Sequence, residues 1–414
     1  MTTSLMLPFL TLEPSIAVDL MESLRFTFFR SIEAAGQEWD IAAPAKDIFL
    51  QRTYLQILEA NPPDGMRFGY LLFYKNNSPI GVAVCQIKYF KGGDNIIDLD
   101  IPKKDACFFW GLAQWVKRWV AGKTTAEILI CGNLLLTGEH GYAFDYQKIN
   151  PVDAMEIMDI ALNSVVDKMA REGVKMPVTL IKDIAPAHQK EGIFLVRKGF
   201  TVFDIQPNMV LELPFQNMES YLSAMSTKYR TRAKRAFKKL DGIERRELSY
   251  TEIQQELPTI YRLYSDIANN AGFNMIDLNE KYLAALELHL SEQFTLYAYY
   301  LEGKLIAFYT TIRNHDELDA HFLGYEKALN HDYQLYLNIL YDIVKIGIDT
   351  GCKRIVFART ALEIKSSIGA EAHNLNCYLR HQHSVANKFV PTILDYLKPV
   401  EVWQPRHPFK EDSH

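Results

Sequence analysis

EGIFLVRKGFTVFDIQPNMVLELP, residues 191–214, is the stretch that decides the fold of this chain of 414 residues. Its opening residues predict a short helix that ends at the pair Gly199-Phe200, where a helix-ending glycine belongs. Strands are predicted around Val202 and over residues 209–213, the second of which carries an apolar-acidic-apolar triplet. The stretch therefore predicts a short helix followed by the last two strands of an α/β unit.

The rest of that α/β unit precedes the stretch. Apolar and aromatic runs on either side of residues 75–79 predict a β-hairpin. Asn150-Pro151 predicts a helix start with Asn150 as the cap, and Gly173 predicts its end. The earlier elements predicted in this half are strand 9–13, helices 15–30 and 48–59, the hairpin 70–89, an insertion at 94–122, strand 126–131, helix 150–173 and strand 178–181.

The same order of elements recurs after residue 240. Even the joints between helix and strand match, because Gly173-Val174-Lys175 in the first half corresponds to Gly351-Cys352-Lys353 in the second. The chain therefore predicts two copies of one unit, with a frayed tail at 405–414. The elements predicted in the second half are strand 243–249, helices 251–267 and 278–290, the hairpin 294–312, strand 318–324, helix 332–349, strand 355–358, helix 361–368 and strand 376–380.

Residues 191–214 resemble the C-terminal signature of GNAT acyltransferases, in which a short helix ends in a Gly-Phe pair and two strands follow. Residues 220–243, with Lys-Tyr-Arg and then Arg-Ala-x-Lys-Lys, are similar to the entry into the second half of Fem-like (FemAB-type) acyltransferases, and ALEIKSSIGA, residues 361–370, resembles the same group. That group carries two GNAT-like halves and includes the peptidoglycan bridge aminoacyltransferases. The resemblance implies an α/β (α+β) fold of two tandem GNAT-like acyltransferase domains, each a mixed central sheet flanked by helices. They are expected at residues 1–215 and 241–414, joined by a basic connecting helix at 216–240.

Composition indicates an ordinary globular protein, with 48% hydrophobic and 23% charged residues. The net charge of -5 and the isoelectric point near 6.1 argue against a general nucleic-acid or membrane-surface binder. The five cysteines are scattered and form no Cys-x-x-Cys pair, which is typical of reduced thiols and gives no metal-site spacing. No signal peptide is visible, and the most apolar stretch, residues 106–122, is too short to span a membrane. We therefore expect a cytoplasmic protein without a membrane span or a metal site.

A basic segment separates the two halves. Seven of the thirteen residues from 228 to 240 are Lys or Arg, and none is acidic. Apolar residues recur every three to four positions through residues 219–240, which predicts one helix docked by an apolar stripe. Arg232 and Arg235 lie on its charged faces and are predicted to bind an anionic substrate. The alternative is a merely solvated face, because charge runs on helices are common.

The resemblance also implies where an acyl donor binds. In the GNAT fold a bulged central strand opens beside its neighbour, and the following loop and helix N-terminus present backbone N–H groups to the pyrophosphate of CoA. The equivalent loops here follow strand 126–131 and strand 318–324, and both depart from the family pattern of Gln or Arg followed by spaced glycines. The predicted donor-binding residues are Gly132, Asn133, Gly138 and Gly141 in the first half and Gly324, Asp332, Tyr333 and Gln334 in the second.

Proton handling gives a second set of candidates. An amine acceptor with a pKa of about 10.4 has to lose a proton, which a carboxylate, a histidine or a water chain must take. Many GNAT enzymes place a tyrosine four residues before the helix-ending glycine, a position that is Leu195 in the first half and Lys365 in the second. Fem-like transferases are similar in using a lysine there, to hold the reacting carbonyl or a phosphate. The second half is therefore predicted to carry out the chemistry, with Lys365, His321 and Tyr325 as its catalytic residues.

Two of the weaker candidates have structural alternatives. Strand alternation places His321 on one face with Asp319 and Leu323. If that face is the cleft, His321 is a base, and if it is the underside of the sheet, His321 is a core histidine. Arg359 and Glu363 lie beside the predicted lysine and are predicted to bind acceptor or donor charge, the alternative being a surface ion pair.

Three functions remain open at this point. The first is an acyl-CoA-dependent N-acyltransferase with no tightly bound cofactor, which uses acyl-CoA as co-substrate and binds an amine-bearing acceptor between the halves. The second is an aminoacyl-tRNA-dependent transferase of the peptidoglycan type, in which the basic helix contacts RNA phosphate. The third is a catalytically inactive GNAT-like binding protein, which the unusual loops favour and the ionisable Lys365 and His321 oppose. The acceptor, the acyl chain and the oligomeric state do not follow from the sequence.

Overall fold

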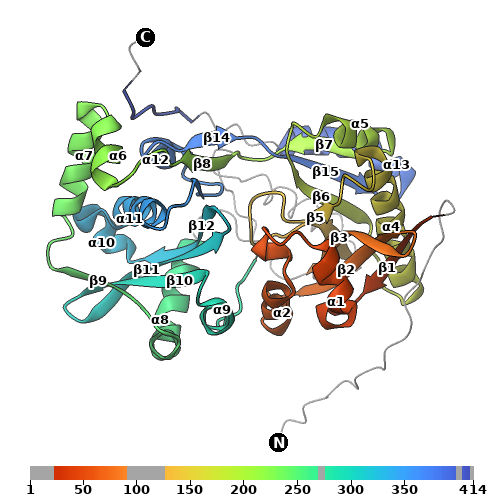
Figure 1. Cartoon of the computed structure of the whole chain (residues 1–414), viewed down its shortest axis with the longest axis horizontal. Coiled ribbons are helices and arrows are strands. Elements are labelled where there is room, and N and C mark those ends of the chain that lie inside the picture. Colours follow the sequence, from red (N-terminus) through yellow and green to blue (C-terminus); the bar gives the residue numbers. More distant parts are fainter. Residues whose placement is uncertain (1–22, 91–125, 269–275, 398–402, 411–414) are drawn as a thin grey trace, which may run out of the picture.

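The computed structural model describes residues 23–90, 126–268, 276–397 and 403–410. Two mixed β-sheets lie side by side, each flanked by helices and each built around one half of the chain (Figure 1). The predicted fold class is therefore confirmed. No helix within the described ranges is long and apolar enough to cross a membrane.

The first sheet has the strand order β1-β2-β3-β4-β6-β15-β7, with β5 paired to β3. The predicted hairpin is confirmed as β2 and β3, which turn at Asn76 and Asn77. Both asparagines have positive φ, as a two-residue hairpin turn requires. The strands are β1 Leu24–Phe29, β2 Met66–Lys75, β3 Ser78–Phe90, β4 Ala126–Cys131, β5 Tyr142–Phe144, β6 Val178–Ile184, β7 Thr201–Asp204 and β15 Asn376–His381.

Helices cover both faces of the first sheet. On one face, α4 begins where the sequence predicts, and the Asn150 side chain accepts the N–H groups of Val152 and Asp153. On the other face, α1 and α2 pack in a core that continues into the second half of the chain. The bounds are α1 Ile32–Ala42, the 3₁₀ turn η1 Ile48–Leu50, α2 Arg52–Ala60, α4 Pro151–Arg171 and α5 Gln189–Arg197.

The second sheet has the strand order β14-β8-β13-β12-β11-β10-β9. Helices α8 and α9 pack on one face, and α6, α7 and α11 pack on the other. The strands are β8 Asn208–Glu212, β9 Ile243–Glu247, β10 Phe294–Leu301, β11 Lys304–Asn314, β12 Glu317–Tyr325, β13 Arg354–Val356 and β14 Glu371–His373. The helices are α6 Met218–Ala224, α7 Thr227–Lys238, α8 Tyr250–Ala268, α9 Tyr282–Leu290, α10 Lys327–Tyr333, α11 Leu335–Asp349, α12 Leu362–Ser366, α13 Ser384–Asn387 and α14 Val390–Leu397.

The last strand of each half of the chain belongs to the sheet of the other half. β8 comes from the first half but pairs with β13 and β14 in the second sheet. β15 comes from the second half but lies between β6 and β7 in the first sheet. Figure 1 shows the exchange as a yellow-green β8 near the cyan and blue elements on the left and a blue β15 beside the green β7 on the right. The division of the chain at residues 215 and 241 stays a prediction, but neither sheet is built from one half alone.

Several local predictions are wrong. Residues 24–29 form β1, not the end of a helix. The basic segment is two helices, because Met225 is extended between α6 and α7 and pairs with Phe409, which also orders part of the tail predicted to be frayed. The helix predicted at 332–349 is interrupted at Gln334, whose left-handed backbone separates α10 from α11. Three predictions fall on residues that the structure does not describe: strand 9–13, helix 15–30 as far as residue 22, and the insertion at 94–122.

Candidate active site

The second sheet opens between β12 and β13. These parallel strands pair only over residues 317–319 and 354–356, although β12 continues to Tyr325. Beyond Asp319 and Val356, no further pair joins the two strands in the described part of the sheet. Separated strands leave backbone N–H and C=O groups that an extended ligand can satisfy. The opening predicted from the GNAT resemblance is therefore present in the second half.

A β-bulge in β12 accompanies this opening. Tyr309 lies opposite Leu323 and Thr311 opposite Ala320, so two β12 residues share Thr310 as their partner. The Thr310 side-chain oxygen accepts the Phe322 N–H at 2.8 Å and donates to the Phe322 carbonyl at 3.1 Å. The hydroxyl thus replaces the ladder contacts that the bulge removes.

Lys365 lies on the β13 side of the opening, on the short helix α12. Its side chain is 4% exposed, so Lys365 is not a solvent-facing lysine. Burial lowers the pKa of Lys365 to about 7, while its carbonyl partners favour the ammonium form. The ammonium therefore ties together the loop at residues 357–361, which we call the β13 loop. It donates to the carbonyl oxygens of Phe357 at 2.6 Å, Ala358 at 3.3 Å and Arg359 at 2.7 Å.

His321 lies beside the bulge and faces the α8–α9 side of the sheet. The bulge breaks the alternation, so the common face predicted for His321 and Leu323 is wrong: Leu323 packs with the core on the α11 side, whereas His321 contacts Tyr282. Its Nε2 is 3.3 Å from the Tyr282 hydroxyl. Desolvation lowers the pKa of His321 to about 3, so it is neutral near pH 7 and holds a proton weakly. This environment favours a hydrogen-bonding role over that of a general base.

A buried polar chain connects His321 to the first half. The Tyr282 hydroxyl lies 3.3 Å from the Tyr54 hydroxyl, which accepts the Asn133 amide at 3.3 Å. Gln86 in turn donates to the Asn133 oxygen at 3.1 Å. Predicted residues of both halves, Asn133 and His321, are therefore joined through two tyrosines across the interface.

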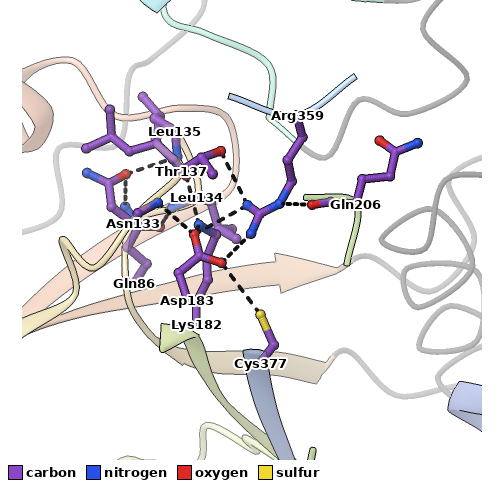
Figure 2. A network of polar contacts seen from close by, with 12 residues as sticks. Gln86, Asn133, Leu134, Leu135, Thr137, Lys182, Asp183, Gln206, Arg359 and Cys377 are labelled. Carbon is purple, nitrogen blue, oxygen red and sulfur yellow. Dashed lines mark hydrogen bonds and ion pairs between the residues drawn. The ribbon is translucent and has the colours of Figure 1, made fainter. Parts of the chain in front are cut away.

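Arg359 lies at a second polar junction between the halves (Figure 2). Its guanidinium pairs with Asp183 on β6, with Nη2 2.6 Å from Oδ1, and also contacts the Thr137 hydroxyl at 3.3 Å. Lys182 donates to the other Asp183 oxygen. Burial alone would raise the pKa of Asp183, but the charges of Lys182 and Arg359 lower it below its usual value. Arg359 therefore forms no ion pair with Glu363, which instead pairs with Arg406 of the tail.

The predicted donor loop of the first half is occupied by protein contacts. The Gly138 N–H donates to Asp183 at 3.1 Å, and Glu139 accepts the Ala185 N–H at 3.0 Å. A Cβ on Gly141 would lie 2.7 Å from the Cα of Gly132, and a Cβ on Gly132 would lie 2.8 Å from the Cβ of Lys182, so close packing accounts for both glycines. This loop contacts the second half and its own sheet, an arrangement that leaves little room for a pyrophosphate.

The predicted donor residues of the second half lie at the far end of β12 and before α11. A Cβ on Gly324 would lie 2.5 Å from the Leu263 backbone, so this glycine allows α8 to approach β12. Tyr325 packs on Tyr336 with ring centroids 5.9 Å apart. Gln334 begins α11 without a cap from its own side chain, but Asn330 Oδ1 accepts the Tyr336 N–H at 3.0 Å, and no acidic residue lies in the first turn of that helix. Asp332 is exposed and Tyr333 half-buried on the preceding turn of α10.

The basic helix α7 lies against α11. Asn338 of α11 donates to the Ala236 carbonyl of α7 at 2.9 Å, and Lys239 donates to the His331 carbonyl of α10 at 3.2 Å. Arg232 and Arg235 are exposed, and neither pairs with a carboxylate of the described residues. The last turn of α7 therefore places unpaired cations near the N-terminus of α11.

Three of the buried ionisable residues at these junctions were not predicted as site residues from the sequence, although Asp319 was noted beside His321. Lys182 and Asp183 lie in an otherwise apolar strand, and a charged pair at the end of a buried run was the available signal. Asp319 is 6% exposed with an Oδ2 that has no hydrogen-bond partner among the described residues, and burial raises its pKa to about 7. No cluster of three or more His, Cys, Asp or Glu in the described segments is arranged to hold a metal ion. A separate cavity of about 470 Å³ in the first half, bordered by Arg30 and Arg67, contains none of the predicted site residues.

Comparisons with known proteins bear on the fold and the family. Residues 227–366 match the family described as an acetyltransferase (GNAT) domain. Among solved structures, FemX covers 86% of this chain and 98% of its own, with 10% identity and a TM-score of 0.51. A tandem GNAT protein from the clavulanic acid biosynthesis pathway covers 86% of this chain and 98% of its own, with 9% identity and a TM-score of 0.48.

A curated relative, the putative 8-amino-7-oxononanoate synthase 2 of Mycobacterium tuberculosis, is 26% identical over 283 residues. The match covers 64% of this chain but only 34% of that protein, so the chain spans about a third of the length of the curated relatives it matches. The matched GNAT segment contains β12, β13 and Lys365, which form the opening described above. Together, the family match and the likeness to FemX show that this chain carries a GNAT acyltransferase domain within a FemAB-like double GNAT fold.

Proposed function

We propose that this protein is an N-acyltransferase in which the second half binds an acyl-CoA and transfers its acyl group to an amine held between the two halves. The separation of β12 from β13 is the observation that carries the proposal, because it exposes strand backbone beside Lys365. A thioester arm lying there can pair with β12 while its carbonyl points toward the β13 loop. Lys365, His321 and Tyr325 remain the proposed catalytic residues, with Lys365 favoured by its position.

The charge distribution supports an anionic donor. Helix N-termini attract phosphate, and α11 begins beside the opening with no acidic side chain in its first turn, although Asn330 Oδ1 accepts one of its N–H groups, that of Tyr336. The exposed cations Arg235 and Lys238 of α7 add positive potential near that end. We therefore assign Gly324, Asp332, Tyr333 and Gln334 to the donor side and Arg232 and Arg235 to recognition of donor charge.

Thermal-shift measurements with acetyl-CoA, longer acyl-CoAs and CoA test the proposal. A donor at a hundredfold excess over its dissociation constant should stabilise the fold by about 2.7 kcal/mol. This corresponds to a rise of a few degrees in Tm for a protein of this size. No shift with any of the thioesters would contradict the acyl-CoA assignment.

An aminoacyl-tRNA donor is the second candidate. The exposed cations of α7 favour it, because there are more of them than are required to neutralise a single pyrophosphate. Deacylated tRNA should then bind with an affinity that falls steeply with salt, whereas acyl-CoAs should leave Tm unchanged. A response to neither class of donor would leave an inactive binding protein as the better description.

A further inference from the structure

We propose that Asp183, a residue of the first half, positions the β13 loop and Lys365 of the second half, so that the transfer site is assembled across the two halves. The inference rests on the proposed function insofar as it places Lys365 at the transfer site. Asp183 acts through Arg359 and touches no substrate, so it is a positioning residue. Its carboxylate holds the Arg359 side chain, and the Arg359 backbone holds the Lys365 ammonium.

Both carboxylate oxygens of Asp183 are used. Oδ1 accepts from Arg359 Nη2 at 2.6 Å and lies 3.7 Å from the Cys377 sulfur. Oδ2 accepts from Gly138 N–H at 3.1 Å, from Arg359 Nη1 at 3.3 Å and from Lys182. The side chain is fully buried, so water does not compete for these contacts. The carboxylate therefore has one fixed orientation toward the second half (Figure 2).

The Arg359 side chain is held along its whole guanidinium group. Nε donates to the Gln206 carbonyl at 2.8 Å, and the other two nitrogens face Asp183 and Thr137. A planar guanidinium bound on several edges cannot rotate without losing hydrogen bonds. Arg359 is thereby held in place, and its carbonyl is one of the three that accept from Lys365, at 2.7 Å.

Backbone conformation shows that these contacts hold a strained loop. Asp183 itself has φ of 61°, an uncommon value for a non-glycine residue. Three residues of the β13 loop and its junction with α12 also have positive φ: Ala358, Thr360 and Ala361. Such conformations persist where surrounding contacts overdetermine them, so loss of the Asp183–Arg359 pair should relax the loop and release Lys365.

The experiment compares Asp183→Asn with Asp159→Asn in the full chain. Asp159 forms a pair with Arg380 that is nearly as short, at 2.7 Å against 2.6 Å, and nearly as buried. This pair also joins the two halves but lies away from the β13 loop. The readout is the rate at which acetic anhydride modifies Lys365, measured by mass spectrometry of its peptide with exposed Lys238 as internal reference. Acetyl-CoA binding is measured on the same variants by thermal shift.

We expect Asp183→Asn to raise the Lys365 modification rate by about tenfold or more, as the loss of a charge-assisted buried hydrogen bond implies. Asp159→Asn should leave the rate at the wild-type value, although its unfolding midpoint falls as well. If Asp183→Asn does not fold, Arg359→Lys is the second variant. It keeps the positive charge but lacks the planar guanidinium that bonds several groups at once, and it should give the same rise in the Lys365 modification rate. An unchanged Lys365 rate in a folded variant of either kind overturns the proposal. Failure of acetyl-CoA to bind the wild type while Lys365 responds as described would contradict the proposed function and leave the positioning role intact.

Discussion

β4 of the first sheet and β12 of the second hold the same place in the repeated order of elements, but they meet their parallel neighbours differently. β4 pairs with β6 to its last residue, where Cys131 lies opposite Ile181, whereas β12 separates from β13 after Asp319. The chain after β4 returns to β3, since Gly132 N–H donates to the Val84 carbonyl and Val84 N–H donates to the Gly141 carbonyl. The first sheet is thus closed where the second is open.

The helices that follow these strands also differ, because the N-terminus of α11 is better suited to a phosphate than that of α4. α4 is capped by the Asn150 side chain and carries Asp153 in its first turn, which occupies its N-terminal N–H groups and disfavours a phosphate. α11 starts at Gln334 with no acidic residue in its first turn, has one first-turn N–H, that of Tyr336, bound by the Asn330 side chain, and lies beside the basic helix α7. This contrast supports the proposed donor site in the second copy of the duplicated unit, with the loop of the first copy beside it.

Replacing Lys365 tests this division most strongly. Lys365→Met should lower turnover by about a hundred- to thousandfold, because the variant lacks both the contacts that hold the β13 loop and the charge that the proposed function places beside the reacting carbonyl. Steady-state transfer from the donor found by thermal shift measures the effect. Some loss of stability is also expected, since buried carbonyls lose their donor. Full turnover by the variant would move the chemistry away from the second half.

The equivalent position in the first half should affect stability alone. Leu195 is fully buried in the core below α4, so Leu195→Ala should cost about 2–5 kcal/mol of unfolding free energy. Ile193→Ala on the same helix is the control, because Ile193 is 53% exposed and its truncation should change stability by about 0.5 kcal/mol or less. Urea unfolding gives both values. A large effect on donor affinity for Leu195→Ala would show that the first half also binds donor.

Asp319 is a buried carboxyl on β12, and it should make the stability of the protein depend on pH. The buried side chains of β4 are apolar and have no such effect. Burial raises the pKa of Asp319 to about 7, so between about pH 4 and 7 the folded state holds a proton that the unfolded state has released. Unfolding free energy therefore falls as pH rises through this window. The difference in unfolding free energy between Asp319→Asn and wild type should therefore change by about 1–3 kcal/mol in favour of the variant between pH 5 and pH 8. Equal pH profiles in urea unfolding would rule out this assignment.

Reversing charge on α7 should have the smallest effect on the fold. Arg232, Arg235 and Lys238 are exposed, so their joint replacement by Glu should change unfolding free energy by about 0.5 kcal/mol or less. Donor affinity should fall and depend less on salt, because fewer cations face the donor phosphates. Lys190→Glu with Arg197→Glu on α5 is the control in the first half, compared with the double variant Arg232→Glu with Arg235→Glu, and should leave donor affinity unaltered. The same loss with both sets would indicate a general charge effect.

The parts of the fold that the sequence could predict are those set by local signals. The turn at Asn76-Asn77, the cap at Asn150 and the helix end at Gly173 all lie where the pattern placed them. The break between α6 and α7 was not predicted, because it depends on pairing of Met225 with a residue near the end of the chain. The strand exchange was missed for the same reason, since pairing between distant segments leaves no local periodicity.

The candidate site was predicted in its parts but not in its arrangement. The sequence indicated Lys365 and Arg359, and the structure places both at the β13 loop. The roles expected of His321 and the glycines depended on a regular strand and an open loop. The bulge at Thr310 and the close approach of α8 at Gly324 depend on tertiary packing, which the sequence pattern does not report.

The exchange of β8 and β15 also sets the order in which the protein can be made. β7 pairs with β15 in the described part of the first sheet, and β15 ends at His381, so this edge cannot form until most of the chain has left the ribosome. At bacterial or eukaryotic rates of synthesis, the wait from β7 to β15 is on the order of ten to thirty seconds. During that interval the nascent first half exposes the flanks of β6 and β7. A premature stop before residue 376 would therefore damage the half of the molecule that was already complete in sequence.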